Sequence, residues 1–365
     1  MGLLNSILKF FLEQRLSEIE RFKNNPHEVQ HLVFKKLLSD AQNTEWGKKY
    51  GYKDNLTVKE FQSRVPVSTY EKLFPYIERM LKGENNILWG SKIEWFSKSS
   101  GTTNDRSKFI PVSYESLQEC HNKCGKDVLT LLIQNHPDTK VFDGKSLSIG
   151  GTHYPNPYNP ETRVGDVSAI FVQNIPAWAE FVRAPSREIF LLDKWEEKIE
   201  RMVETTMNEN ITSLSGVPTW MVVVLQRLLE KTGKSNILEV WPNLEVFLHG
   251  AVSFVPYKEL FKKLIPSSDF HYIELYNASE GFFGVQDLPN NDEMLLMLDH
   301  GVFYEFIPLE ELDNEHPQAV TLEQVELNKN YALVISTNAG LWRYLIGDTI
   351  KFTNLSPYRI KISGR

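Results

Sequence analysis

The chain has 365 residues, and a typical size of about 150 residues per domain predicts two or three lobes. Hydrophobic residues make up 41% and charged residues 24%, which is ordinary globular composition. The formal net charge of −7 argues against a general nucleic-acid binder and against a protein that binds membrane surfaces through positive charge.

Residues 1–90 are predicted to form a helical segment. Apolar residues repeat at helical spacing from Leu12 to Phe22, and Pro26 ends that run. The apolar start, residues 1–12, is interrupted by polar residues and lacks a small-residue cleavage site, so it predicts an amphipathic helix and not a signal peptide. Because no stretch reaches about 18 uninterrupted apolar residues, we expect a soluble, cytoplasmic protein without a membrane partner.

Residues 91–290 predict α/β lobes. Ile93, Trp95 and Ser97 alternate with the residues between them, as in a strand. A polar loop follows, and then a short extended segment over 109–112, in which Pro111 suits an edge strand. Residues 114–135 predict a helix. Residues 141–165, rich in Gly, Pro, Asn and Tyr, predict a long ordered loop.

Cysteine usage agrees with the expected compartment. Cys120 and Cys124 are the two cysteines of the chain, too few for a disulfide framework, and they lie four residues apart on the predicted helix. We expect two reduced, structural thiols, as is usual in the cytosol.

The second half of the α/β region contains a predicted buried helix that starts at Pro218 and is closed by Gly233. Two short buried strands are predicted over 244–248 and 272–275. The second of these ends in a polar segment, Tyr276–Gly281.

Residues 291–360 predict a β-rich lobe made of two hairpins. The first joins 294–298 to 302–307 through Asp299-His300-Gly301, and the second joins 331–337 to 341–346 through Asn338-Ala339-Gly340. The predicted elements are helices first, then mixed helices and strands, and then hairpins. This order predicts an α/β fold with layered lobes and a β-barrel-like lobe.

The polar loop that begins at Ser99 has the chemistry of a polyphosphate site. Hydroxyls and glycine-loop N–H groups donate to anionic oxygens, Gly101 allows close backbone approach, and Lys108 adds positive charge. The order Gly-Lys-Ser/Thr is absent, so this is not a Walker loop. Many loops of this composition are only turns.

Two later segments could complete a nucleotide site. The ring of Tyr276 can stack on a purine, Ser279 can donate to a phosphate, and Glu280 is a hard oxygen ligand for Mg²⁺. A strand that ends in a polar turn would show the same pattern of residues. Asp348, after Gly347, can accept hydrogen bonds from ribose hydroxyls, although Asp before Thr is also a common turn.

Taken together, these segments resemble the three nucleotide motifs of the acyl-adenylating superfamily, which includes CoA ligases, peptide-synthetase adenylation domains and firefly luciferase. Over essentially the whole chain the sequence is more similar to the Gretchen Hagen three family of auxin-responsive acyl acid amido synthetases, and to its bacterial members. The closer resemblance includes 241–244, 248–253 and 341–344. Lys108 follows Gly101 by seven positions, as in the amido synthetases, whereas six is typical of CoA ligases.

The resemblance implies a role for each motif residue. The β- and γ-phosphates would be held by Ser99, Ser100, Gly101, Thr102, Thr103 and Lys108. The adenine slot would be formed by Gly250, Ala251 and Tyr276. Asn277 and Ala278, in the same motif as Tyr276, are further cofactor-binding candidates. Ser279 would contact the α-phosphate, Glu280 the Mg²⁺ and Asp348 the ribose. Lys108 and Glu280 are the candidate catalytic residues, and Glu280 is the candidate metal ligand.

Two features depart from the family pattern. The loop has Asn104-Asp105-Arg106 where a second glycine is usual, and Asn tolerates left-handed backbone. Residues 361–365 resemble the start of the hinge, where Arg365 would approach the ribose. The resemblance implies that a C-terminal domain of about 100–150 residues follows this point in family members, and we expect residues 1–365 to comprise only the N-terminal part of the fold.

The implied reaction uses ATP and Mg²⁺ to convert a carboxylic acid to an acyl-adenylate, whose acyl group is then transferred to an amine, plausibly that of an amino acid. One alternative is an acyl- or aryl-CoA ligase, which the position of Lys108 disfavours. Another is a nucleotide-binding module without catalysis. The residues leave open which acid and amine are used, which side chains form the acid pocket, and the oligomeric state.

Overall fold

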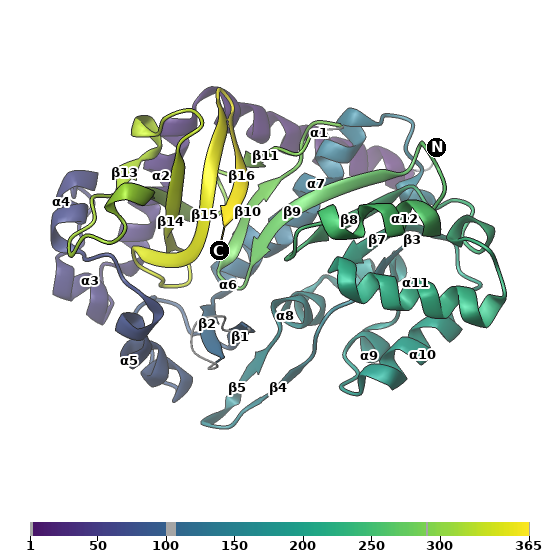
Figure 1. Cartoon of the computed structure of the whole chain (residues 1–365). Coiled ribbons are helices and arrows are strands. Elements are labelled where there is room, and N and C mark those ends of the chain that lie inside the picture. The colour runs from purple at the N-terminus through teal and green to yellow at the C-terminus, as the bar shows by residue number, and fades with distance from the viewer. Residues whose placement is uncertain (1–2, 100–106, 290, 365) are drawn as a thin grey trace. The chain divides into compact units, whose positions relative to one another are not determined.

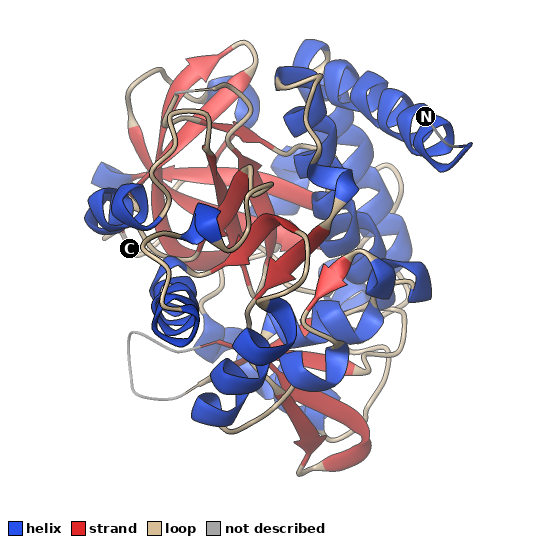
Figure 2. Ribbon diagram, turned by 90° about the vertical axis from the view of Figure 1, so that its right-hand side faces the viewer, coloured by secondary structure: helices blue, strands red, loops and turns tan. Residues whose placement is uncertain are grey.

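The computed structural model describes residues 3–99, 107–289 and 291–364. The chain divides into two compact units. Unit 1 contains Met1–Leu131, Tyr154–Val164 and Ser279–Arg365, and unit 2 contains Leu132–His153 and Gly165–Ala278. Both helices and strands run through the chain (Figure 2), which confirms the predicted α/β class.

Unit 1 begins with five helices, drawn from purple to dark blue in Figure 1. They are α1 (Leu3–Asn24), α2 (Pro26–Ala41), α3 (Glu45–Tyr50), α4 (Val58–Arg64) and α5 (Tyr70–Leu81). Pro26 separates the first two, as predicted, and stands at the first position of α2, where its missing N–H costs nothing. Thr57 and Glu60 form a capping box at the start of α4. None of the described helices is long and apolar enough to cross a membrane.

A four-stranded sheet of order β2-β1-β5-β4 follows. Its strands are β1 (Trp95–Ser99), β2 (Lys108–Val112), β4 (His153–Asn156) and β5 (Asn159–Gly165). The edge position predicted for Pro111 is confirmed, since β2 lies at the end of this order. The prediction of a long loop over 141–165 is wrong, because this range contains strands. Its Pro and Asn residues form a tight turn between β4 and β5, in which the Tyr158 N–H donates to Asn156 Oδ1 at 3.0 Å.

The segment after β2 is helical, as predicted. It comprises α6 (Tyr114–Ser116), a π-helical turn (Leu117–His121) and α7 (Asn122–Asn135). Cys120 and Cys124 are both free thiols. Cys120 is buried, and its Sγ accepts a hydrogen bond from the Phe282 N–H at 3.1 Å, so its role is structural.

The C-terminal strands of unit 1 are antiparallel, in the order β13-β12-β14-β15-β16-β11-β10. They are β10 (Gly281–Val285), β11 (Met294–Leu296), β12 (Val302–Pro308), β13 (Val320–Thr321), β14 (Asn330–Thr337), β15 (Tyr344–Leu355) and β16 (Tyr358–Gly364). The second predicted hairpin is confirmed, with Ile335 of β14 opposite Tyr344 of β15.

The first predicted hairpin is wrong, because β11 pairs with β10 and β16 and not with β12. The physical reason lies in α2. The Gln30 side-chain amide donates to the carbonyl oxygens of Leu298 and Val302, at 2.8 and 2.9 Å, and its oxygen accepts from the Tyr304 N–H at 3.0 Å. A helix side chain therefore takes the backbone groups that a hairpin would have paired.

Unit 2 contains a parallel sheet of order β9-β8-β7-β3-β6. Its strands are β3 (Lys145–Ser148), β6 (Arg183–Ala184), β7 (Ile211–Gly216), β8 (Val246–Gly250) and β9 (His271–Ala278). Its helices are α8 (Val167–Asn174), α9 (Arg187–Phe190), α10 (Trp195–Thr206), α11 (Pro218–Thr232) and α12 (Lys258–Leu264).

The core of unit 2 lies between these strands and helices, where Leu214, Phe247 and Met221 have no exposed surface. The helix predicted from Pro218 is α11, and Gly233 closes it with a φ of 65°. Because the strands are parallel, β8 and β9 place their carboxyl ends, and the residues that follow, at one edge of the sheet.

Candidate nucleotide-binding site

The described part of the predicted phosphate loop consists of its two ends. Ser99 ends β1 and Lys108 begins β2, and the two residues are direct cross-strand partners. The Lys108 ammonium lies 5.8 Å from the centre of the Tyr70 ring. Ser100, Gly101, Thr102 and Thr103 lie outside the described residues, so their phosphate contacts stay a prediction.

Asp348 lies in a β-bulge of β15. Ala332 of β14 pairs with Thr349 and Val334 pairs with Leu345, so one residue of β14 faces three residues of β15. Gly347 has a φ of +100°, a backbone conformation that L residues with a side chain rarely adopt. The glycine before the aspartate is therefore needed for the bulge, which leaves Asp348 7% exposed.

The hydroxyl of Tyr344 links the two acidic candidates, because both influence its pKa. It is buried and has no hydrogen-bond partner among the described residues. Burial raises the pKa of Tyr344 strongly, and the negative charges of Glu280, Glu71 and Asp348 raise it further. The carboxylates of Glu280 and Asp348, predicted for Mg²⁺ and ribose, thus both influence the pKa of one buried phenol of unit 1.

Glu280 is the single candidate metal ligand of this site. Among the described residues no three or more His, Cys, Asp or Glu side chains are grouped to bind a metal. Mg²⁺ commonly takes one or two carboxylates and completes its shell with substrate phosphates and water. The donor set of this site, with Glu280 as a single candidate carboxylate, fits an ion that arrives with a nucleotide.

The adenine-side candidates lie in unit 2, at the carboxyl ends of β8 and β9. Gly250 pairs with Leu275, and a Cβ at Gly250 would lie 2.4 Å from the Leu275 carbonyl oxygen and 2.7 Å from Asn277 Oδ1. Only glycine fits there. Ala251 follows with a φ of +68° and is exposed, whereas Tyr276 is buried.

The Tyr276–Glu280 segment joins the two sets of candidates along the chain. Ala278 is the last residue of unit 2, and Ser279 is the first of the segment that returns to unit 1. Near the C-terminus, Gly364 pairs with Thr349, the residue after Asp348. Arg365 lies outside the described residues, so its contact with a ribose stays a prediction.

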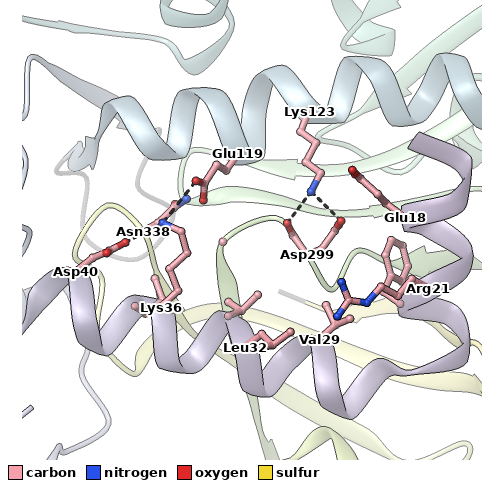
Figure 3. A pocket seen from close by; sticks show the side chains of 14 residues that line it. Glu18, Arg21, Val29, Leu32, Lys36, Asp40, Glu119, Lys123, Asp299 and Asn338 are labelled. Atoms are coloured by element: carbon pink, nitrogen blue, oxygen red, sulfur yellow. Dashed lines mark hydrogen bonds and ion pairs between the residues drawn. The ribbon is translucent and has the colours of Figure 1, made fainter. Parts of the chain in front are cut away.

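A separate cavity of about 340 Å³ lies in unit 1, lined by α1, α2, the π-helical turn, α7 and the turns that precede β12 and β15. Figure 3 shows Lys123 pointing to Asp299, and Lys36 between Asp40 and Glu119. None of the described nucleotide candidates lines this cavity. Because these ammonium groups already face carboxylates, the cavity is not assigned to the nucleotide.

Comparison with solved structures identifies the fold. Structures of 2-hydroxyisobutyryl-CoA ligase in complex with its acyl-adenylate share the fold, with a TM-score of 0.57 and 11% sequence identity over 92% of this chain and 74% of that chain. The fold is that of the adenylate-forming enzymes.

Family models identify the particular family to which the chain belongs. The GH3 family N-terminal domain matches residues 15–270, and the GH3 family central domain matches residues 295–365. The chain belongs to the GH3 family, as its motifs indicated. The GH3.15 acyl acid amido synthetase has a similar structure, with a TM-score of 0.79 and 18% identity over 96% of this chain and 71% of that chain.

Similar sequences carry amido synthetase names. Indole-3-acetic acid-amido synthetase GH3.3 of Arabidopsis thaliana is 26% identical over 397 residues, which cover 92% of this chain and 66% of the relative. Jasmonoyl–L-amino acid synthetase JAR4 of Nicotiana attenuata is 25% identical over 422 residues, which cover 96% and 71%. The chain therefore spans roughly two thirds of the length of these relatives.

Proposed function

We propose that the chain carries the adenylation site of an acyl acid amido synthetase. It binds MgATP, activates a small carboxylic acid as an acyl-adenylate, and the acyl group is then transferred to an amine, that of an amino acid. The observation that carries the proposal is the buried Tyr344 hydroxyl, which has no partner among the described residues and whose pKa is raised by the charges of Glu280 and Asp348, in a chain of the GH3 family. A buried hydroxyl without a partner is costly unless a ligand completes it.

The first step is an in-line substitution at phosphorus. A carboxylate oxygen of the acid forms a bond to the α-phosphorus of ATP while the bond to the bridging oxygen breaks, and pyrophosphate leaves with the electron pair. Mg²⁺, held with the help of Glu280, would neutralise charge on the phosphates. Lys108 adds positive charge to the leaving pyrophosphate, and Asp348 orients the ribose. Positioning and charge neutralisation supply most of the rate in such a step.

In the second step the amine nitrogen forms a bond to the carbonyl carbon of the acyl-adenylate. The carbon–oxygen bond to phosphate breaks, AMP leaves, and the nitrogen loses a proton. Gly250, Ala251 and Tyr276 hold the adenine during both steps. The two free cysteines support a reducing compartment, and we place the protein in the cytoplasm.

The test is acid-dependent exchange of radioactive pyrophosphate into ATP, measured with a panel of aryl, indole and aliphatic acids. We expect exchange with at least one acid and its loss in Asp348→Asn. Glu310→Gln, at an exposed residue outside every motif, is the control and should retain exchange. ATP binding without exchange for any acid would favour a nucleotide-binding module over an enzyme.

A second assay separates the acceptors. The acid that supports exchange is incubated with the protein, MgATP and either an amino-acid mixture or CoA, and the products are identified by mass spectrometry. An amide with an amino acid is the expected product. A thioester with CoA and no amide would replace the proposal with a CoA ligase.

A further inference from the structure

Tyr70, a residue outside every nucleotide motif, makes two contacts with the strand that Lys108 begins. Its hydroxyl accepts a hydrogen bond from the Phe109 N–H at 2.7 Å, and its ring lies 5.8 Å from the Lys108 ammonium. We propose that Tyr70 is a positioning residue, which holds Lys108 at the place where it meets the phosphates of the nucleotide. This inference rests on the proposed function.

The hydrogen bond has a clear structural reason. β2 is an edge strand whose sheet partner is β1, so the N–H groups on its outer side need partners from outside the sheet. The Tyr70 hydroxyl supplies the partner for Phe109, the residue next to Lys108. Fixing the backbone of Phe109 fixes where the Lys108 side chain begins.

The ring adds a second restraint on the same lysine. An ammonium within about 6 Å of an aromatic ring centre is attracted by the ring's electrons. The Tyr70 phenol stays neutral at ordinary pH, because burial raises its pKa to about 12. It therefore holds the lysine without neutralising its positive charge, which remains available for a phosphate.

Tyr70 is itself held by the strand that carries Asp348. Ser68 forms a parallel bridge with Tyr344. The Ser68 N–H donates to the Arg343 carbonyl at 2.8 Å, and the Leu345 N–H donates to the Ser68 carbonyl at 2.9 Å. Two residues later, Tyr70 begins α5. A short, hydrogen-bonded path within unit 1 thus runs from the ribose candidate to the phosphate candidate.

This arrangement predicts a selective effect on the nucleotide. Tyr70→Phe keeps the ring and removes the oxygen that accepts from Phe109. We expect the Kd for MgATP, measured by calorimetry, to rise by up to about tenfold, because Lys108 must then be ordered at the expense of binding energy. The KM for MgATP should rise in parallel, while the KM for the acid stays constant. Tyr70→Leu, which also removes the ring, should weaken MgATP binding further.

The control is on the same helix. The Tyr76 hydroxyl accepts from the Lys49 ammonium at the surface, at 2.9 Å, so Tyr76→Phe removes a hydroxyl without touching β2. It should leave the Kd for MgATP unchanged. Thermal unfolding of each variant checks that the fold is retained.

A double-mutant cycle tests whether Tyr70 acts through Lys108. In a Lys108→Ala background, Tyr70→Phe should cause little further loss of MgATP affinity, because the positioned group is gone. Equal Kd values for wild type and Tyr70→Phe, or the same loss with and without Lys108, would overturn the inference. Wild-type protein that binds MgATP but shows no pyrophosphate exchange would overturn the proposed reaction alone, and absence of MgATP binding would overturn both.

Discussion

Arg343 and Glu305 form a buried ion pair in which the Arg343 Nε lies 3.2 and 3.0 Å from the two carboxylate oxygens of Glu305. Arg343 is 5% exposed and Glu305 1%. The guanidinium also donates to the carbonyl oxygens of Gln62 and Val65, at 2.9 and 2.6 Å. The pair therefore ties the end of α4 to β12 and to the residue that precedes β15, the strand that carries Asp348.

Arg343→Met should lower the stability of the protein markedly. It leaves the Glu305 carboxylate buried without its charged partner, a change that costs about 3–5 kcal/mol. Chemical denaturation followed by circular dichroism measures the free energy of unfolding. Lys262→Met breaks an exposed ion pair with Glu259 and is the control, expected to show no measurable change. A loss for Arg343→Met no larger than that control would contradict the structural role of the pair.

Gly347→Ala tests whether the backbone conformation at this position, and not its packing, requires glycine. No atom lies within 4 Å of a Cβ at Gly347, so the cost comes from its φ of +100° and is about 1–3 kcal/mol. Relaxing this strain would turn Asp348 away, so MgATP affinity should fall as well. Gly125→Ala, in α7 and equally open, should be neutral or stabilising. For both variants, denaturation curves measure the free energy of unfolding and calorimetry measures the affinity for MgATP.

Signals that lie close together in the sequence were predicted well, and long-range ones were not. Pro26 and Gly233 mark helix ends for local reasons. The bulge at Gly347 was not predicted, although the sequence places this glycine directly before Asp348. The pairing of β11 depends on Gln30, which is 268 residues from Leu298 along the chain. No local pattern carries that information.

The same distinction applies within the site. The three nucleotide motifs are recognisable because each combines several informative residues in a short segment. Tyr70 was missed because it is a single aromatic residue at a helix start, and its meaning comes from Phe109, 39 residues further on. Tyr344 belonged to a motif, but only the fold shows that its hydroxyl is buried without a described partner.

Stability should fall as the pH rises above neutrality because of His300. Burial alone lowers the pKa of His300, but its 2.6 Å contact with the Asp127 carboxylate outweighs this, and the pKa is raised to about 9. A raised histidine pKa stabilises the fold fully below the unfolded value of 6.5, and this contribution disappears as the pH passes 9. The free energy of unfolding should decrease by up to about 3 kcal/mol between these values.

The variant His300→Gln isolates this contribution. Glutamine does not titrate, so the decrease between pH 6.5 and 9 should vanish from denaturation curves. His316→Gln, at an exposed histidine, should retain the wild-type slope. An unchanged slope in His300→Gln would assign the pH dependence to other groups.

Tyr344→Phe should make the protein more stable and a weaker nucleotide binder. In the free protein the Tyr344 hydroxyl is buried without a partner among the described residues, so its removal should raise the free energy of unfolding by about 1 kcal/mol. With MgATP bound, the variant loses a hydroxyl donor whose pKa is influenced by Glu280 and Asp348, and the Kd should rise by about tenfold. Tyr304→Phe is the matched control, because the Tyr304 hydroxyl is buried but donates to the Met297 carbonyl at 3.0 Å. That variant should lose stability and keep its affinity for MgATP, and the opposite pattern would remove Tyr344 from the site.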